Sequence, residues 1–140
     1  MRKDRQLRRL VVGEDVWLWS VRHRHGPEQV QGPGPGPGRP ECREVLSLHH
    51  GATRATVRIV FREYPGRILA GAYLPGGAVA ARAGGMLNLH EPGVVRRFLD
   101  ALPDEVRDAM RGNGPRPSAP RETELDGWPL FDALTAADHD

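Results

Sequence analysis

The stretch ATVRIVFRE, residues 55–63, decides the fold because apolar and polar side chains alternate along it. Side chains two residues apart share one face of a β-strand, so its odd-numbered positions form a single apolar face. Two earlier stretches, VWLWSVRHRH at 16–25 and CREVLSLHH at 42–50, are rich in residues that favour strands. We therefore predict three strands that pair as an antiparallel meander.

The apolar side chains of these three strands meet on a shared face only in one kind of register, because a slip of one residue swaps the faces. That register pairs Trp19 with Leu48, Val21 with Leu46, Leu48 with Val57 and Leu46 with Ile59. Burial of each large side chain contributes about 1.5–3 kcal/mol, which favours this register over its neighbours. The predicted inner face consists of Trp17, Trp19, Val21, Leu46, Leu48, Val57, Ile59 and Phe61.

The rest of the chain contains weaker strand signals followed by helical ones. Short strands are expected within residues 67–74, 78–82 and 86–90, separated by glycine-rich turns. Apolar residues then recur every three or four positions over 92–102, which predicts a helix that Pro103 ends or kinks, and a second helix follows over 104–111. The expected fold is α+β: an antiparallel sheet of five to six strands, followed by C-terminal helices that pack on one face.

The expected organisation is a single α+β domain over residues 1–112, with a basic arm at 1–9 and a loop rich in glycine and proline at 26–40. A linker at 113–120 precedes an acidic tail at 121–140, in which an apolar turn around Trp128 and Phe131 predicts a short docked helix. Residues 1–67 carry 13 basic and 7 acidic side chains, whereas the tail carries one arginine and six acids. The tail could therefore fold over a basic surface.

Composition excludes several classes of protein. The 140 residues are 39% hydrophobic and 27% charged, which is typical of one globular domain. No apolar run reaches the roughly 18 residues of a membrane span. The single cysteine, Cys42, allows no internal disulfide, so we expect a reducing, cytoplasmic location and no membrane association. No motif for phosphate binding or nucleophilic catalysis is present, so we expect neither an enzyme nor a cofactor.

The best functional signal is a set of arginines on the face opposite the apolar one. The predicted register places Arg22, Arg24, Arg43, Arg58 and Arg62 there, and we call this surface the arginine face. Guanidinium groups bind carboxylates through two parallel hydrogen bonds, so we expect a small non-catalytic module that binds an acidic protein partner. Such a module could be an adaptor, an inhibitor or an immunity-type protein. The alternative is nucleic-acid binding by the same face and the N-terminal arm, although the tryptophans fall on the core side.

A second, weaker signal lies at one end of the inner face. The register gathers His23, His25 and Cys42 there, close to Glu44 and Glu63. Histidine and thiolate can bind zinc, and a Cys42–His25 pair could form a thiolate–imidazole couple. The spacing matches no established zinc pattern, so we expect no metal and interpret these side chains as polar residues at the rim of the sheet. The remaining histidines, His49, His50 and His90, are expected at turns or strand ends.

Overall fold

The computed structural model describes residues 7–25, 42–69, 77–82, 84–112 and 122–138, which form eight strands and three helices. The three strands predicted from the alternating stretches are β2 (Asp15–His25), β3 (Cys42–His50) and β4 (Thr56–Arg62). They pair antiparallel, and all four predicted cross-strand pairs are present. Of the eight predicted inner-face side chains, seven are at most 2% exposed and Val21 is partly buried against them. The predicted register is therefore confirmed.

Two further strands, which the sequence analysis did not anticipate, complete this main sheet. Strand β1 (Arg8–Val12) forms a hairpin with β2 through a two-residue turn. Gly13 occupies the first turn position with φ 62°, a conformation that matches the twist of the flanking strands. Arg8 and Arg9, the last basic residues of the expected arm, thus belong to the sheet.

Strand β8 (Glu122–Asp126) lies on the other side of β4 and runs parallel to it, so the strand order is β1-β2-β3-β4-β8. The acidic segment after residue 121 therefore contributes an edge strand to the main sheet. The expected loop at 26–40 and the expected linker at 113–120 lie outside the described residues.

The weaker strand signals form a second, separate sheet. It consists of β5 (Arg67–Leu69), β6 (Ala78–Ala81) and β7 (Met86–Asn88), all antiparallel. Residues 70–74 of the first expected strand lie outside the described residues. The second sheet does not extend the meander because β8 occupies the position next to β4.

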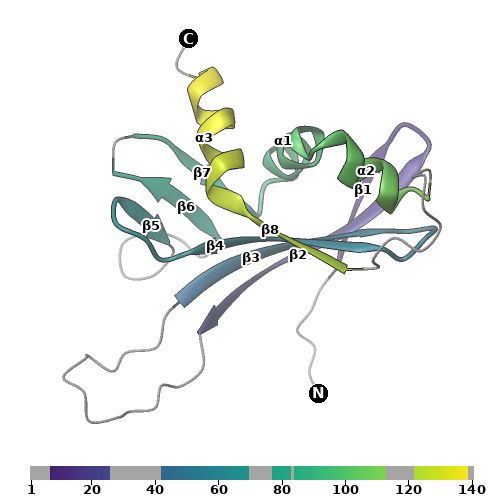
Figure 1. The fold of residues 1–140 in the computed structure, drawn as a ribbon, viewed down its shortest axis with the longest axis horizontal. Coiled ribbons are helices and arrows are strands. Elements are labelled where there is room, and N and C mark those ends of the chain that lie inside the picture. The colour runs from purple at the N-terminus through teal and green to yellow at the C-terminus, as the bar shows by residue number, and fades with distance from the viewer. Residues whose placement is uncertain (1–6, 26–41, 70–76, 83, 113–121, 139–140) are drawn as a thin grey trace.

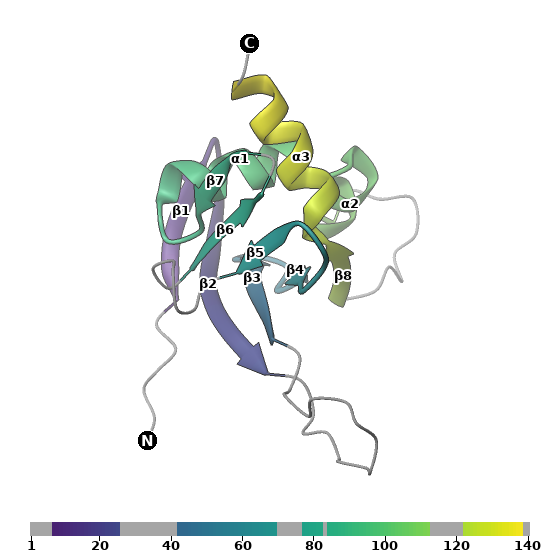
Figure 2. The ribbon, with the colours of Figure 1, turned by 90° about the vertical axis from the view of Figure 1, so that its left-hand side faces the viewer.

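The helices α1 (Pro92–Ala101), α2 (Asp104–Met110) and α3 (Gly127–Asp138) all lie on the inner side of the main sheet, together with the second sheet (Figures 1 and 2). Leu102 and Pro103 separate α1 from α2, as the sequence predicted. The α+β fold class with C-terminal helices on one face is confirmed. In the described part of the chain, we find no helix with both the length and the apolar character needed to cross a bilayer.

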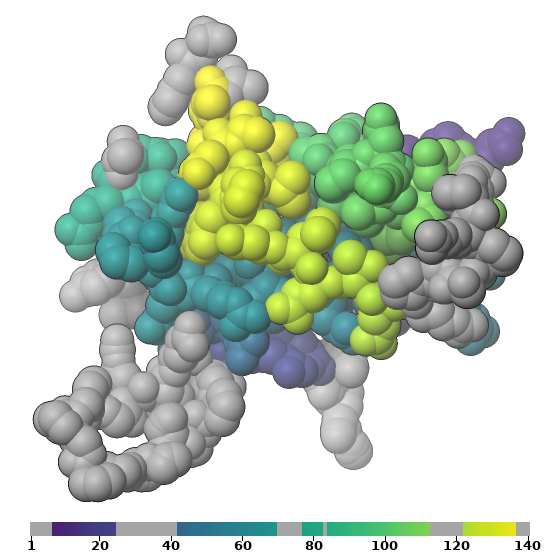
Figure 3. Space-filling model, viewed as in Figure 1, coloured from purple at the N-terminus to yellow at the C-terminus, as the bar shows by residue number. Residues whose placement is uncertain are grey.

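Aromatic side chains join the sheet to the helices. Phe61 of β4 contacts Phe98 of α1 and Trp128 of α3 edge to face, with ring centroids 5.7 and 5.1 Å apart. Trp128 also donates a hydrogen bond from Nε1 to the carbonyl oxygen of Arg62, at 2.9 Å. A Cβ atom on Gly127 would lie 2.5 Å from the Phe61 ring, so only glycine fits there. The yellow and lime atoms of α3 and β8 accordingly pack without a gap on the teal atoms beside them (Figure 3).

Candidate functional site

The five predicted arginines all lie on the outer face of the main sheet, opposite the helices. Strand register places Arg24, Arg43 and Arg62 in one row across β2, β3 and β4. Directly opposed residues have Cβ atoms about 4.5–5.5 Å apart, so three guanidinium groups share one line across the sheet. No described helix covers this face, which is the lower side of the sheet in Figure 1. The arginine face is thus a real surface feature, although its role in binding remains a prediction.

The arginine face is hollowed rather than flat. An open hollow of about 520 Å³ lies over it, and serines and valines of the central strands line it together with four of the arginines. Val45 and Val60 are only 7% and 3% exposed although they are on this outer face. We attribute their burial to the hydrocarbon stems of the neighbouring arginines, which cover apolar surface while the charged ends reach water. The lining residues are Leu7, Ser20, Arg22, Arg24, Arg43, Val45, Ser47, His49, Arg58, Val60 and Glu124.

Two of the five arginines form ion pairs with β8. Arg58 Nη1 donates to Glu122 Oε1 at 2.9 Å, and Arg62 Nη2 donates to Glu124 Oε2 at 2.8 Å. The hydrogen bond from Arg58 lowers the pKa of the Glu122 carboxyl below its usual value. All four side chains are at least 40% exposed, so solvent screens both pairs and either can open at little cost.

The other three arginines are different. Among the described residues, Arg22, Arg24 and Arg43 form no ion pair with an acidic side chain. The Nε atom of Arg43 is buried and has no hydrogen-bond partner in that part of the chain. A buried donor without an acceptor costs about 1–3 kcal/mol of stability.

An exposed apolar strip continues from the arginines onto the β1–β2 hairpin. Val11 and Val16 lie opposite each other on the outer face and are 58% and 38% exposed. The half-buried Leu18 and the exposed Leu7, which reaches into the hollow, connect them to the arginines, and the exposed Arg9 lies directly opposite Leu18 on the same outer face. We call Leu7, Val11, Val16 and Leu18 the apolar strip. This strip is not apparent from the sequence, because Leu7 falls within the expected arm and β1 was not predicted.

The expected polar cluster at the inner rim divides into separate contacts. His23 Nδ1 lies 2.6 Å from Glu44 Oε1, and Glu63 accepts a hydrogen bond from the Cys42 backbone at 3.2 Å. Glu44 is only 1% exposed, and its burial raises the pKa of this carboxyl, although hydrogen bonds from His23 and the Gly77 backbone oppose the rise. In the described residues, no three His, Cys, Asp or Glu side chains gather as metal ligands do, and the side chain of His25 lies outside them.

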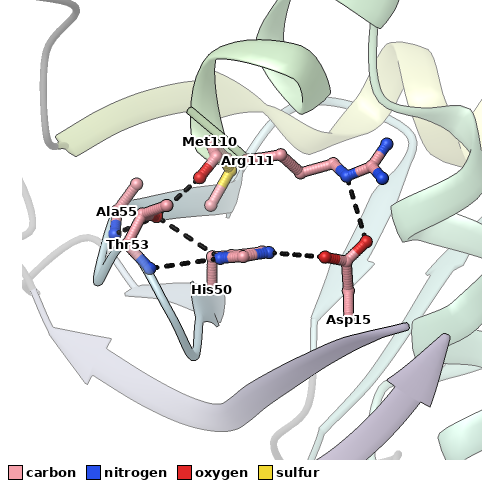
Figure 4. A network of polar contacts seen from close by, with 6 residues as sticks. All are labelled: Asp15, His50, Thr53, Ala55, Met110 and Arg111. Carbon is pink, nitrogen blue, oxygen red and sulfur yellow. Dashed lines mark hydrogen bonds and ion pairs between the residues drawn. The ribbon is translucent and has the colours of Figure 1, made fainter. Parts of the chain in front are cut away.

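A second polar network ties the sheet to α2 (Figure 4). His50, which is 4% exposed, lies with Nε2 2.9 Å from Asp15 Oδ1, and Arg111 Nε contacts the other oxygen of Asp15 at 3.0 Å. The Thr53 hydroxyl lies 3.4 Å from His50 Nδ1, which gives an Asp–His–Thr series. The prediction that His50 ends a strand is confirmed, but its burial and partners were not foreseen.

The hydrogen bonds of this series do not prepare Thr53 as a nucleophile. Thr53 has one hydroxyl proton, and it donates this proton to the carbonyl oxygen of Met110 at 2.6 Å. The same hydroxyl oxygen accepts the Ala55 amide at 3.2 Å, and His50 Nδ1 accepts the Thr53 amide at 3.3 Å. A nucleophile must instead give its proton to the histidine. The network therefore fixes the end of α2 against the β3–β4 turn.

No protein-family model, no curated protein and no solved structure matches this chain.

Proposed function

We propose that this chain is a non-catalytic binding module whose arginine face and apolar strip together bind an acidic surface of a protein partner. The observation that carries the proposal is the position of Arg22, Arg24 and Arg43. These arginines lie on a rigid sheet, without an acidic partner among the described residues, and next to exposed aliphatic side chains. Binding sites placed on strands hold their side chains in a defined geometry.

Two features favour a protein over a nucleic acid. Protein interfaces combine apolar contacts with arginines, and the apolar strip supplies such contacts beside the hollow. Proteins that bind single strands offer aromatic rings for stacking. Here Trp17, Trp19 and Phe61 are buried on the inner face. In addition, the outward-facing Glu122 and Glu124 would repel a phosphate backbone.

Arg22, Arg24 and Arg43, which have no acidic partner among the described residues, contribute most to the proposed binding. A carboxylate that meets Arg22, Arg24 or Arg43 forms charge-assisted hydrogen bonds without first breaking an existing pair. It also relieves the repulsion between the opposed guanidinium groups of Arg24 and Arg43. At Arg58 and Arg62, by contrast, an incoming carboxylate has to replace a glutamate of β8.

The proposal can be tested by nuclear magnetic resonance with the full, isotope-labelled chain. A short oligo-glutamate peptide, added at low salt, should shift the arginine side-chain signals and backbone amides of the hollow. The double variant Arg24→Met and Arg43→Met should weaken this binding about tenfold or more, because two charge-assisted contacts are lost. The matched control, Arg82→Met with Arg96→Met, removes the same charge away from the arginine face and should leave the affinity unchanged.

Duplex and single-stranded DNA serve as competing ligands in the same experiment. Binding of DNA alone, with an affinity that falls steeply as salt rises, would assign the face to nucleic acid instead. A peptide that causes no shifts on this face at millimolar concentration would exclude the proposal.

A further inference from the structure

The outer face of β2 changes character along a single strand. Its outward positions are, in order, Val16, Leu18, Ser20, Arg22 and Arg24, so an apolar end leads through a hydroxyl to a cationic end. Alternate residues of a strand are about 6.6–6.8 Å apart, and these five positions therefore form a line about 26 Å long. A ligand that follows this line meets aliphatic and cationic side chains at fixed intervals.

From this line we infer the kind of segment that the partner presents, an inference that rests on the function proposed above. We propose that the partner presents an extended segment with acidic residues at two alternate positions and aliphatic residues at two later alternate positions. Such a segment lies along β2 and directs every second side chain at the sheet. Its acids face Arg22 and Arg24, a small polar residue faces Ser20, and its aliphatic residues face Leu18 and Val16.

The neighbouring strand strengthens the cationic end of this line. Arg43 lies directly opposite Arg24 on β3, and adjacent strands are about 4.7–4.9 Å apart. A carboxylate above Arg24 is therefore within reach of two guanidinium groups.

The chain itself contains an example of the proposed acid spacing, although β8 pairs edge to edge with β4 and does not lie over the outer face. Strand β8 is an extended segment whose Glu122 and Glu124 occupy alternate positions and share the outer face. Each of these glutamates binds a different arginine of the arginine face, at 2.9 and 2.8 Å. Two acids at alternate positions of an extended backbone thus each reach an arginine of this sheet, although Arg58 and Arg62 are four residues apart on β4.

Two labelled synthetic peptides of identical composition and charge test the inference by fluorescence anisotropy. In the first, the inward positions are two glutamates, a threonine, a leucine and a valine, with serine at every position between them. In the second, the two glutamates are adjacent and the leucine and valine are adjacent. The full chain should bind the first peptide roughly fivefold or more tightly, because the loss of one contact of about 1 kcal/mol raises the dissociation constant about fivefold.

The outcomes separate this inference from the function on which it rests. If both peptides bind equally, the face does not recognise the spacing of these side chains and the inference is wrong, while the proposed function stands. If neither binds, the proposed function and the inference both fall. The variant Arg24→Met should remove the preference between the two peptides, whereas Arg82→Met should preserve it. A preference that survives Arg24→Met would place recognition elsewhere.

Discussion

Replacement of Arg43 by methionine is expected to stabilise the protein while it weakens binding. Arg43 is the central member of the row and lies opposite Arg24 on one side and Arg62 on the other. Opposed like charges cost about 0.2–1 kcal/mol per pair, and Glu124 already neutralises part of the Arg62 charge. Methionine keeps an unbranched stem to cover Val45 but removes the charge and the buried Nε donor, which has no hydrogen-bond partner in the described part of the chain.

With each of these terms taken near the lower end of its range, the gain in the free energy of unfolding is about 1–2 kcal/mol. For a chain of this size the melting temperature should rise by about 3–8 °C. Urea unfolding at low salt measures the free energy, and repetition at about 0.5 M salt separates its two parts. Screening shrinks the Debye length to a few ångströms, so the repulsive part should disappear and the part due to Nε should remain.

The control is Arg82→Met, an exposed site outside the arginine face, where the change should stay within about 0.5 kcal/mol. A methionine variant at position 43 that is less stable than the unmodified chain would refute the reasoning. It would mean that Arg43 has a favourable structural role and that the row stores no repulsion for a ligand to relieve.

Three other changes have defined outcomes. Replacement of Glu122 and Glu124 by glutamine should free two arginines and tighten binding of an acidic peptide roughly 2- to 10-fold, measured by anisotropy. Burial raises the pKa of the Glu44 carboxyl in the folded state, so folding favours its protonated form. The stability of the unmodified chain relative to Glu44→Gln should therefore fall as the pH rises through that pKa, and urea unfolding measures this difference. The hydrogen bond from His50 lowers the pKa of the Asp15 carboxyl in the folded state. The ionised Asp15 should therefore make the chain about 1–2 kcal/mol more stable than Asp15→Asn above pH 4. Urea unfolding should show that this difference is lost as the pH falls through the lowered pKa.

Each of these three changes has a control or an opposing result. Glu91→Gln with Glu105→Gln alters the net charge equally on the helical side, and it should leave peptide binding unchanged. A constant stability difference between pH 4.5 and 7.5 would show that Glu44 titrates as an ordinary surface carboxyl. For the third change, equal acid sensitivity of the aspartate and asparagine forms would show that Asp15 has no bond to a charged partner.

The sequence predicts the centre of the main sheet well because large apolar side chains alternate there without interruption. Trp19, Leu48 and Val57 can share a core only in one register, and burial of these three outweighs the alternatives. The same parity places the arginines on the opposite face. The breaks at Pro103 and Gly112 are equally local, because proline and glycine act on their own segment of backbone.

The edge strands could not be predicted in this way. Strand β8 has the sequence ETELD, which contains one aliphatic residue and no strong preference for extended structure. Its conformation follows from contacts distant in sequence, since Trp128 and Phe131 dock in the core just after it and Arg58 and Arg62 bind its glutamates. Which arginines pair with acidic side chains of the described residues depends on this strand, so no local pattern could reveal it.

The position of β8 makes the arginine face asymmetric, and this asymmetry gives the proposed complex a direction. Beside β4, the glutamates of β8 balance Arg58 and Arg62, whereas on β2 and β3 the charge of Arg22, Arg24 and Arg43 has no described counterpart. The apolar strip lies on the side of β1, away from β8. An acidic segment is therefore attracted to the β2–β3 side and repelled from the β8 edge. Its aliphatic end should point toward the β1–β2 turn, so a spin label at that end should broaden the Val11 and Val16 signals and leave those of β8 unaffected.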